Sequence, residues 1–430
     1  MENKISFFWF RRDLRLEDNR GLSEALKSET KVIPVFIFDS EILDKLPKDD
    51  ARISFIFETL QKLDGQLKEV QSSLLIEIGN PIDIWKKLVS KYNTEAVFTN
   101  KDYEPYALNR DKKVEEFLDT NNVKFKAYKD QVIFEECDVL KDDGLPYTVF
   151  TPYKNKWLKV FSKEKDTRSY DISFDDFYRF KAMFPSLDSI GFVASAIKVK
   201  PYNLEYLDNY DEVRDFPSKD KTSYLSPYFR FGLVSVRKMV TVALNTNATF
   251  LSELIWREFF MQILYHFPKV VTYNFRQKYD AVPWRNNEEE FKKWCQGQTG
   301  YPMVDAGMRE LNATGYMHNR VRMITAGFLC KHLLIDWRWG EAYFAEKLLD
   351  YELSANNGNW QWAAGTGCDA APYFRVFNPE AQLKKFDKDL KYVRKWVKDY
   401  DKLSYAKPIV DHKFARERAI SCYKQALSVV

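Results

Sequence analysis

The sequence predicts an α/β amino-terminal domain, built as a doubly wound parallel sheet, and an all-helical carboxy-terminal domain. Its 430 residues exceed the size at which one hydrophobic core keeps growing, so we expect two domains. Short β-rich runs alternate with helical patterns over about residues 1–130, which is typical of a Rossmann-like fold. Beyond residue 200 the strand signals vanish and helical periodicity dominates.

Five short apolar or β-rich runs are the expected strands. They are residues 5–10, 31–38, 74–78, 96–99 and 124–128. Helices are predicted between them, where apolar residues recur at three- and four-residue spacing; these are residues 53–70, 81–92 and 108–120. The first strand is followed by RRDLRLEDN and not by a glycine-rich fingerprint, so we expect no dinucleotide bound there in the usual way.

The expected domain boundaries follow from where the periodicity changes. Residues 1–132 form the α/β domain, and residues 201–430 form the helical domain. Residues 133–200 mix charges, aromatic residues and prolines without sustained periodicity, so we interpret them as an ordered connector.

Composition excludes several classes of protein. The formal net charge is only +4, so affinity for nucleic acid would have to come from local basic patches. Five widely spaced cysteines without a CxxC pair, and a start without a signal peptide, predict a reduced, cytoplasmic protein. The four histidines lack metal-ligand spacing, so no metal is expected. No apolar run approaches the ~20 residues of a membrane span.

The stretch DYELSANNGNWQW is the strongest candidate binding surface. Asp350 and Glu352 can accept hydrogen bonds, Asn356 can donate and accept, and Trp360 and Trp362 present flat π-faces. The alternative interpretation is a capped turn with core tryptophans, because asparagine and glycine favour turns.

Two further motifs have both a functional and a purely structural interpretation. In TSYLSPYFRFG, Ser226 precedes Pro227 as a helix N-cap would, and Thr222 and Ser223 lie upstream. The free N–H groups of such a helix start suit a pyrophosphate. A helix cap without a ligand is the commoner case. In SELIWREFF, Glu253, Trp256, Arg257 and Phe260 share one helix face, which lines either a pocket or a structural ion pair.

The motif GYMHNRVRMITAGF places Asn319 and Met323 one helical turn apart, with Arg320 and Arg322 beside them. These arginines would hold nucleic-acid phosphates if they border an aromatic pocket, and would otherwise form a solvated basic face.

Together these residues resemble the photolyase and cryptochrome family of flavoproteins. The motifs occur in the family's order and spacing over nearly the whole chain: FFWFRRDLRLEDN, TPYKNKWL, TSYLSPYFRFG, ELIWREF, GYPMVDAGMRELNATGYMHNRVRMI and NNGNWQW. Within the family the sequence is most similar to the class I enzymes that use light to repair cyclobutane pyrimidine dimers in DNA. UV-damaged DNA is therefore the expected partner, and we expect a monomer.

The resemblance implies an FAD buried in the helical domain. Asn356 would face the redox-active nitrogen of the flavin ring; plant cryptochromes typically carry Asp there, so Asn favours repair. The cofactor-binding residues implied in this way are Tyr210, Thr222, Ser223, Leu225, Ser226, Arg257, Arg322, Asp350, Glu352 and Asn356. Dimer photolyases more often have Asp at the position of Glu352.

The resemblance also implies a pocket for a flipped-out lesion and a chain of tryptophans that carries an electron to the flavin. Trp256 and Trp362 would stack against the pyrimidines, and Glu253 and Asn319 would hydrogen-bond their edges. The lesion pocket would comprise Glu253, Trp256, Asn319, Arg320, Met323, Trp362 and Gln382. The electron chain would comprise Trp360, Trp337 and Trp284.

The second, antenna chromophore is left open by the sequence. The residue pairs that hold a folate in some relatives are absent from YEPYAL and FPKVV, whereas Arg52 and Asp102 resemble positions that line a deazaflavin pocket. A deazaflavin, a folate or another flavin therefore stays possible. Alternative functions are a cryptochrome-type blue-light receptor, a (6-4) photolyase, or a light-independent flavin or DNA-binding module.

Overall fold

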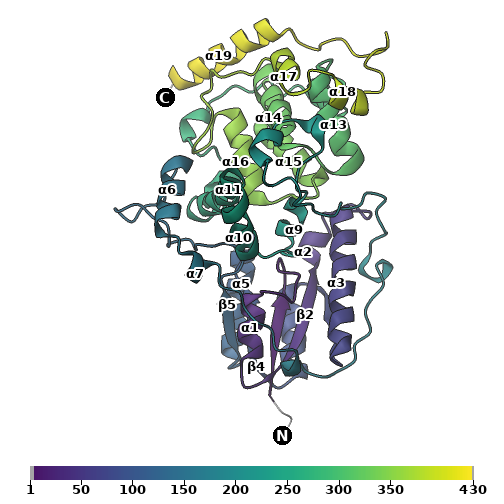
Figure 1. Ribbon diagram of the computed structural model, residues 1–430, viewed down its shortest axis with the longest axis vertical. Coiled ribbons are helices and arrows are strands. Elements are labelled where there is room, and N and C mark those ends of the chain that lie inside the picture. The colour runs from purple at the N-terminus through teal and green to yellow at the C-terminus, as the bar shows by residue number, and fades with distance from the viewer. Residues whose placement is uncertain (1–3, 429–430) are drawn as a thin grey trace. The chain divides into compact units, whose positions relative to one another are not determined.

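The chain forms two compact units that interleave along the sequence. The computed structural model describes residues 4–428, which Figure 1 shows as a ribbon. The first unit comprises residues 4–138, 160–201 and 225–245, and the second comprises residues 139–159, 202–224 and 246–428. Both units draw on the range 133–200 that we expected to be a connector, and the first also takes part of the range assigned to the helical domain.

A five-stranded parallel sheet forms the centre of the first unit. Each of the five predicted runs is a strand, within a few residues: β1 Ile5–Phe10, β2 Lys31–Asp39, β3 Leu75–Gly79, β4 Thr94–Asn100 and β5 Lys124–Tyr128. The strand order is β3-β2-β1-β4-β5. The order reverses direction between β1 and β4, as in a doubly wound sheet, so the predicted fold class is confirmed.

The central strand β1 shows why the predicted strands are continuous apolar runs and do not alternate between apolar and polar residues. All six residues of β1 are buried, because helices cover both faces of the sheet. Phe8 and Phe10 belong to the core on one face, and Phe7 and Trp9 belong to the core on the other. In the register of the sheet, Phe7 lies between Ile33 of β2 and Val97 of β4.

The helices of the first unit follow the strands in the expected alternation. They are α1 Arg20–Leu26, α2 Ser40–Leu43, α3 Ala51–Glu69, α4 Pro81–Lys91, α5 Pro105–Thr120, α7 Lys163–Asp166, α9 Ser226–Arg230 and most of α10 Val236–Thr246.

Buried ion pairs tie α10 to the loop after β1. Asp130 accepts from Arg15 at 2.7 Å and from Arg237 at 2.8 Å. Burial alone would raise the pKa of Asp130, but the two guanidinium groups have a larger effect and lower the pKa.

The backbone at Gly232, where φ is +65°, passes very close to the backbone of Arg12. A Cβ at this position would lie 2.0 Å from the carbonyl oxygen of Arg12, so only glycine allows the two backbone segments to come so close.

Apart from an isolated bridge between Leu140 and Pro146, the regular elements among the described residues of the second unit are helices. Its longer helices are α6 Phe150–Val160, α11 Ala248–His266, α12 Glu288–Cys295, α13 Pro302–Thr314, α14 Asn319–Gly327, α15 Trp337–Lys347, α16 Leu353–Ala364, α17 Pro379–Phe386 and α19 His412–Ser428. Shorter ones are α8 Tyr210–Val213, α18 Lys391–Trp396 and the π-helical η6 Phe328–Leu333. Within residues 4–428, none of the helices combines the length and apolar content that a membrane span requires.

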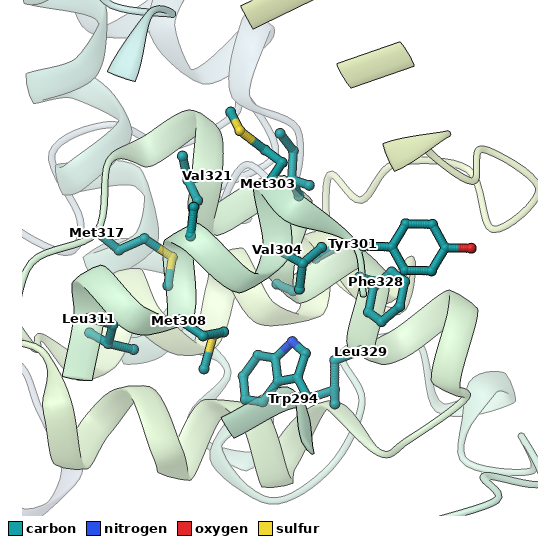
Figure 2. Packing of buried hydrophobic residues seen from close by; sticks show 14 of the residues in the cluster. Trp294, Tyr301, Met303, Val304, Met308, Leu311, Met317, Val321, Phe328 and Leu329 are labelled. Carbon is teal, nitrogen blue, oxygen red and sulfur yellow. The ribbon is translucent and has the colours of Figure 1, made fainter. Parts of the chain in front are cut away.

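The core of the second unit holds α13 and α14 against each other. Figure 2 shows Trp294, Met308 and Val321 among the side chains of this cluster. Gly307 makes the close contact possible, because a Cβ there would lie 2.3 Å from Cγ1 of Val321. The indole Nε1 of Trp294 donates to the carbonyl oxygen of Thr325 at 3.1 Å, so the polar atom of this buried ring is satisfied.

A buried lysine lies at the carboxyl end of α16. The Nζ of Lys331 donates to the carbonyl oxygen of Ala364 at 2.6 Å and lies 3.9 Å from the ring centroid of Tyr423 on α19. The hydroxyl of Tyr423 donates to the same carbonyl oxygen. These donors satisfy a carbonyl in the last turn of α16 that has no partner within the helix. Burial lowers the pKa of Lys331 to about 7.

We therefore predict a pH-dependent contribution of Lys331 to stability. Between about pH 7 and pH 10.5 the unfolded chain binds a proton that the folded protein gives up, so stability rises with pH across this window. Relative to Lys331→Met, the free energy of unfolding should rise by about 3 kcal/mol between about pH 7 and pH 9.5. Urea titrations of both proteins measure this difference, and parallel pH profiles would contradict it.

Candidate functional site

A cavity in the second unit brings together residues that the sequence singled out separately. It is bordered by α14, α15, α16 and the segment before α16. Its lining comprises Asn319, Arg322, Met323, Ala326, Phe344, Leu348, Asp350, Tyr351, Glu352, Ala355, Asn356, Asn359, Trp360, Trp362 and Ala363. The lining therefore combines part of the expected flavin set with part of the expected lesion set.

Helix α14 presents three of these residues on one face. Arg322 and Met323 lie three and four positions after Asn319, so both are one helical turn from it, and all three line the cavity. The guanidinium of Arg322 donates from Nη2 to Asp350 at 2.9 Å and from Nε to the carbonyl oxygen of Met317 at 2.8 Å. The charged group is thus fixed at the cavity wall with its carboxylate partner.

Helix α16 begins at the cavity, and Glu352 is its N-cap. The Glu352 carboxylate accepts from the backbone N–H of Ala355 at 2.9 Å and from the hydroxyl of Ser354. The capped-turn interpretation is therefore correct for this side chain, which also lines the cavity. A carboxylate at a helix start is favourable because it satisfies free N–H groups.

The orientation of Asn356 is set by a residue that sequence reasoning missed. Its Nδ2 donates to the side chain of Glu341 on α15 at 2.9 Å and to the Glu341 carbonyl oxygen at 3.1 Å. Burial raises the pKa of Glu341. Because the amide nitrogen is engaged, the carbonyl oxygen of Asn356 is the group that remains for a ligand N–H. No motif singled out Glu341, which lies on a neighbouring helix.

The three predicted electron-transfer tryptophans belong to, or pack against, one hydrophobic core. Trp337 and Trp360 are buried, and Trp284 is half-buried. Trp337 lies on α15 and donates from Nε1 to Asn274 at 2.8 Å. Trp360 lies on α16 and packs so closely on α15 that a Cβ at Gly340 would be 2.1 Å from its ring.

Two predicted lesion residues lie on α11 and are not in the cavity lining. Glu253 is paired with Arg214 at 2.5 Å, and Trp256 is stacked on Phe150 with ring centroids 3.6 Å apart. Arg214 and Phe150 were both missed, because each contact joins segments far apart in the sequence. The isolated sequence pattern indicated only that Glu253 and Trp256 share a helix face.

Arg320 and Gln382 also lie outside the cavity lining. The Arg320 guanidinium is paired with Asp215 at 2.7 Å and lies 4.4 Å from the ring centroid of Phe386. Gln382 lies on α17 of the same unit.

Comparisons with known proteins match both units. Residues 6–169 match the family described as DNA photolyase, and residues 250–404 match the family described as the FAD binding domain of DNA photolyase. The deoxyribodipyrimidine photo-lyase of Synechococcus is 34% identical over 98% of this chain and 97% of its own length. The enzyme of that name from Escherichia coli is also 34% identical, over 97% of this chain and 98% of its own.

The chain belongs to the DNA photolyase family.

Solved structures agree with this family assignment. A bacterial class III photolyase from Agrobacterium tumefaciens has a TM-score of 0.89 at 32% identity, covering 100% of this chain and 98% of its own. An archaeal photolyase from Sulfolobus tokodaii with two FAD molecules has a TM-score of 0.84 at 34% identity, covering 98% of this chain and 99% of its own. A Synechocystis cryptochrome shares the fold, with a TM-score of 0.84 at 24% identity over 98% of this chain.

Of the flavin residues expected from the photolyase resemblance, four line the cavity: Arg322, Asp350, Glu352 and Asn356. Tyr210, Thr222, Ser223 and Arg257 belong to the same unit but are not in its lining, and Leu225 and Ser226 belong to the first unit.

The expected N-cap role of Ser226 is wrong. Helix α9 starts at Ser226 itself, the N-cap position is taken by Leu225, and no side-chain cap hydrogen bond forms. The reason is local: Leu225 has helical angles, φ −72° and ψ −21°, whereas a capping side chain needs an extended backbone.

The first unit of this photolyase-family chain contains a pocket of its own at the carboxyl ends of β1 and β2. Such crevices, where strand order reverses, are the usual ligand sites of doubly wound sheets. The lining of the pocket includes Asp102, Arg12, Arg110 and Arg230. Burial pushes the pKa of Asp102 upward, but the surrounding guanidinium groups, that of Arg12 foremost, lower it to about 2.

Asp102, one of the two residues that resemble positions in a deazaflavin pocket, lines this pocket, whereas the other, Arg52, does not. The Arg52 guanidinium bonds to the carboxylate of Asp50, with Nη2 to Oδ2 at 2.5 Å.

We predict that Glu341 is needed for FAD binding in the cavity, because it orients the side-chain amide of Asn356. Glu341→Leu leaves the amide nitrogen of Asn356 with the backbone carbonyl as its one remaining acceptor on residue 341. One N–H of this half-buried amide loses its partner, and loss of such a hydrogen bond costs about 1 kcal/mol or more. Retained FAD per protein chain after gel filtration should fall roughly fivefold or more. Glu341→Gln keeps a side-chain acceptor at this place and serves as the matched control. Equal FAD content in the two variants would contradict the assignment.

Proposed function

We propose that the protein is a deoxyribodipyrimidine photo-lyase, which uses light to split cyclobutane pyrimidine dimers in DNA. The observation that carries this proposal is the composition of the cavity, where Arg322, Asp350 and Asn356 meet Asn319 and Trp362. Relatives of that name match the chain over nearly its full length and support the same activity.

The cavity residues fit a bound FAD. Arg322 offers a fixed positive charge, Asp350 and Glu352 offer carboxylate acceptors, and Asn356 offers a carbonyl oxygen held by Glu341. A flavin ring needs this mixture of donors, acceptors and apolar walls. When bound and reduced, FAD would supply the electron for repair under light. Tyr210, Thr222, Ser223 and Arg257, which belong to the same unit as the cavity, are the proposed contacts to the rest of the cofactor.

We assign recognition of the extruded dimer to Glu253, Trp256, Asn319, Arg320, Met323, Trp362 and Gln382. Trp362, and the part of the Trp256 indole that Phe150 leaves uncovered, offer stacking surfaces. Base stacking on an aromatic side chain is worth about 1–3 kcal/mol per base. Glu253 and Asn319 offer hydrogen-bonding groups for the base edges. A damaged pair is already weakened, so extruding it costs less than extruding an intact pair.

Trp360, Trp337 and Trp284 would supply electrons to the cofactor when it is oxidised. The gradient of exposure supports this role, because Trp360 and Trp337 are buried and Trp284 reaches partly to solvent. Short steps between indoles replace one long transfer.

The pocket in the first unit would hold a second chromophore. Its guanidinium groups favour an anionic ligand such as the phosphate of a flavin nucleotide, and aromatic residues such as Trp9 and Phe36 border it. The Sulfolobus tokodaii relative, described with two FAD molecules and a novel light-harvesting cofactor, supports this interpretation. Deazaflavin and folate are the other candidates.

The repair activity is tested by incubating the protein, with its FAD reduced, with dimer-containing DNA under blue light. We expect dimers to disappear in the light and to persist in the dark. DNA carrying (6-4) products is the control substrate and should remain unchanged. Persistence of dimers with loss of (6-4) products would favour the (6-4) photolyase, and no repair of either would favour a cryptochrome-type receptor.

The electron route makes a separate prediction for Trp284→Phe. The variant should lose most photoreduction of oxidised FAD, because phenylalanine is much harder to oxidise than tryptophan. Repair by protein whose FAD has been reduced chemically should stay close to that of the parent. Absorption spectra during illumination and the dimer assay measure the two halves. Full photoreduction in the variant would show that electrons enter by another route.

A further inference from the structure

The indole of Trp256 is held in an aromatic stack within the second unit. Phe150, the first residue of α6, lies parallel to it, with ring centroids 3.6 Å apart and planes 8° apart. Phe260, one helical turn further along α11, lies 5.4 Å away at 27°. Trp256 itself is half-buried, so part of the indole stays accessible.

Helix α6 is anchored so that Phe150 cannot move freely. The backbone N–H of Phe150 donates to Oδ2 of Asp369 at 3.0 Å. Two further side chains of α6 bond to the buried carboxylate of Glu258 on α11: Trp157 donates from Nε1 at 2.7 Å, and Tyr153 donates from its hydroxyl at 3.3 Å. Glu258 is two positions from Trp256, so α6 is fixed to the same part of α11.

Phe260, the second ring close to the Trp256 indole, contacts α16. A Cβ at Gly358 would lie 2.2 Å from Cδ1 of Phe260, so the two helices are in direct contact at this glycine. Gly358 lies between Asn356 and Trp360, which both line the cavity. The stack therefore connects α6, through Trp256 and Phe260, to the helix that forms the cavity wall.

We propose that Phe150 is a positioning residue for lesion recognition, acting by fixing the plane of the Trp256 indole before DNA binds. This inference rests on the proposed function. A base that meets an indole already held in place avoids the cost of ordering that side chain on binding. The two rings lie face to face with little offset. The hydrogen bonds that anchor α6 to Glu258 and Asp369 hold the Phe150 ring against the indole and so limit the orientations open to Trp256.

The test compares Phe150→Leu, which keeps apolar bulk but removes the ring, with Phe150→Tyr, which keeps the ring. The readout is the ratio of Kd values for undamaged and dimer-containing duplexes, measured in the dark with FAD content matched. Phe150→Leu should lower this ratio about two- to tenfold, as expected for the loss of one aromatic pair. Phe150→Tyr should restore it to within about twofold of the parent.

A double-mutant cycle separates positioning from a general structural effect. If Phe150 acts through Trp256, Phe150→Leu should change the ratio no further in a Trp256→Ala background. An equal loss in both backgrounds, or an equal loss of affinity for the two duplexes, would overturn the inference, as would an unchanged ratio in Phe150→Leu. If that variant does not fold, Phe150→Met replaces it with the same expectations. A parent protein without lesion selectivity would instead refute the proposed function.

Discussion

The close packing of α16 on its neighbours is the constraint on which the site depends. Where α15 meets α16, Gly340 of α15 leaves room for the Trp360 ring of α16. Where α16 meets α11, Gly358 of α16 leaves room for the Phe260 ring of α11. Neither contact tolerates a methyl group without displacing an aromatic ring, so the three helices have little freedom to slide. The positions of Asn356 and Trp362 at the cavity follow from this packing.

Both ends of α16 are held by charged or ionisable side chains. Glu352 caps its amino end, and Lys331 from η6 donates to a carbonyl in its last turn. The carboxylate at the start matches the helix dipole. The Lys331 amine donates to a carbonyl at the end that has no partner within the helix. One helix fixed in this way carries Asn356, Trp360 and Trp362 at the cavity, so the geometry of the proposed cofactor contact and of the two tryptophans is set together.

Local patterns predicted the elements, and tertiary contacts explain what the patterns missed. The five strands were predictable because a parallel sheet covered on both faces needs continuous apolar runs. Asn319 and Met323 were predictable as neighbours because helical spacing places them on one face. Glu341 and Phe150 carried no such signal, since each meets its partner from another helix. Ser226 before Pro227 matched a cap pattern, but the helical backbone of Leu225 prevents that role.

The most direct measurement is an experimental structure of the protein with FAD and a duplex that contains one cyclobutane dimer. The account predicts the flavin ring in the cavity beside Asn356, with the Arg322 and Asp350 pair close to it. It also predicts the dimer extruded from the duplex, with its bases against Trp256 and Trp362. A flavin bound outside this cavity, or a dimer still stacked within the duplex, would contradict it.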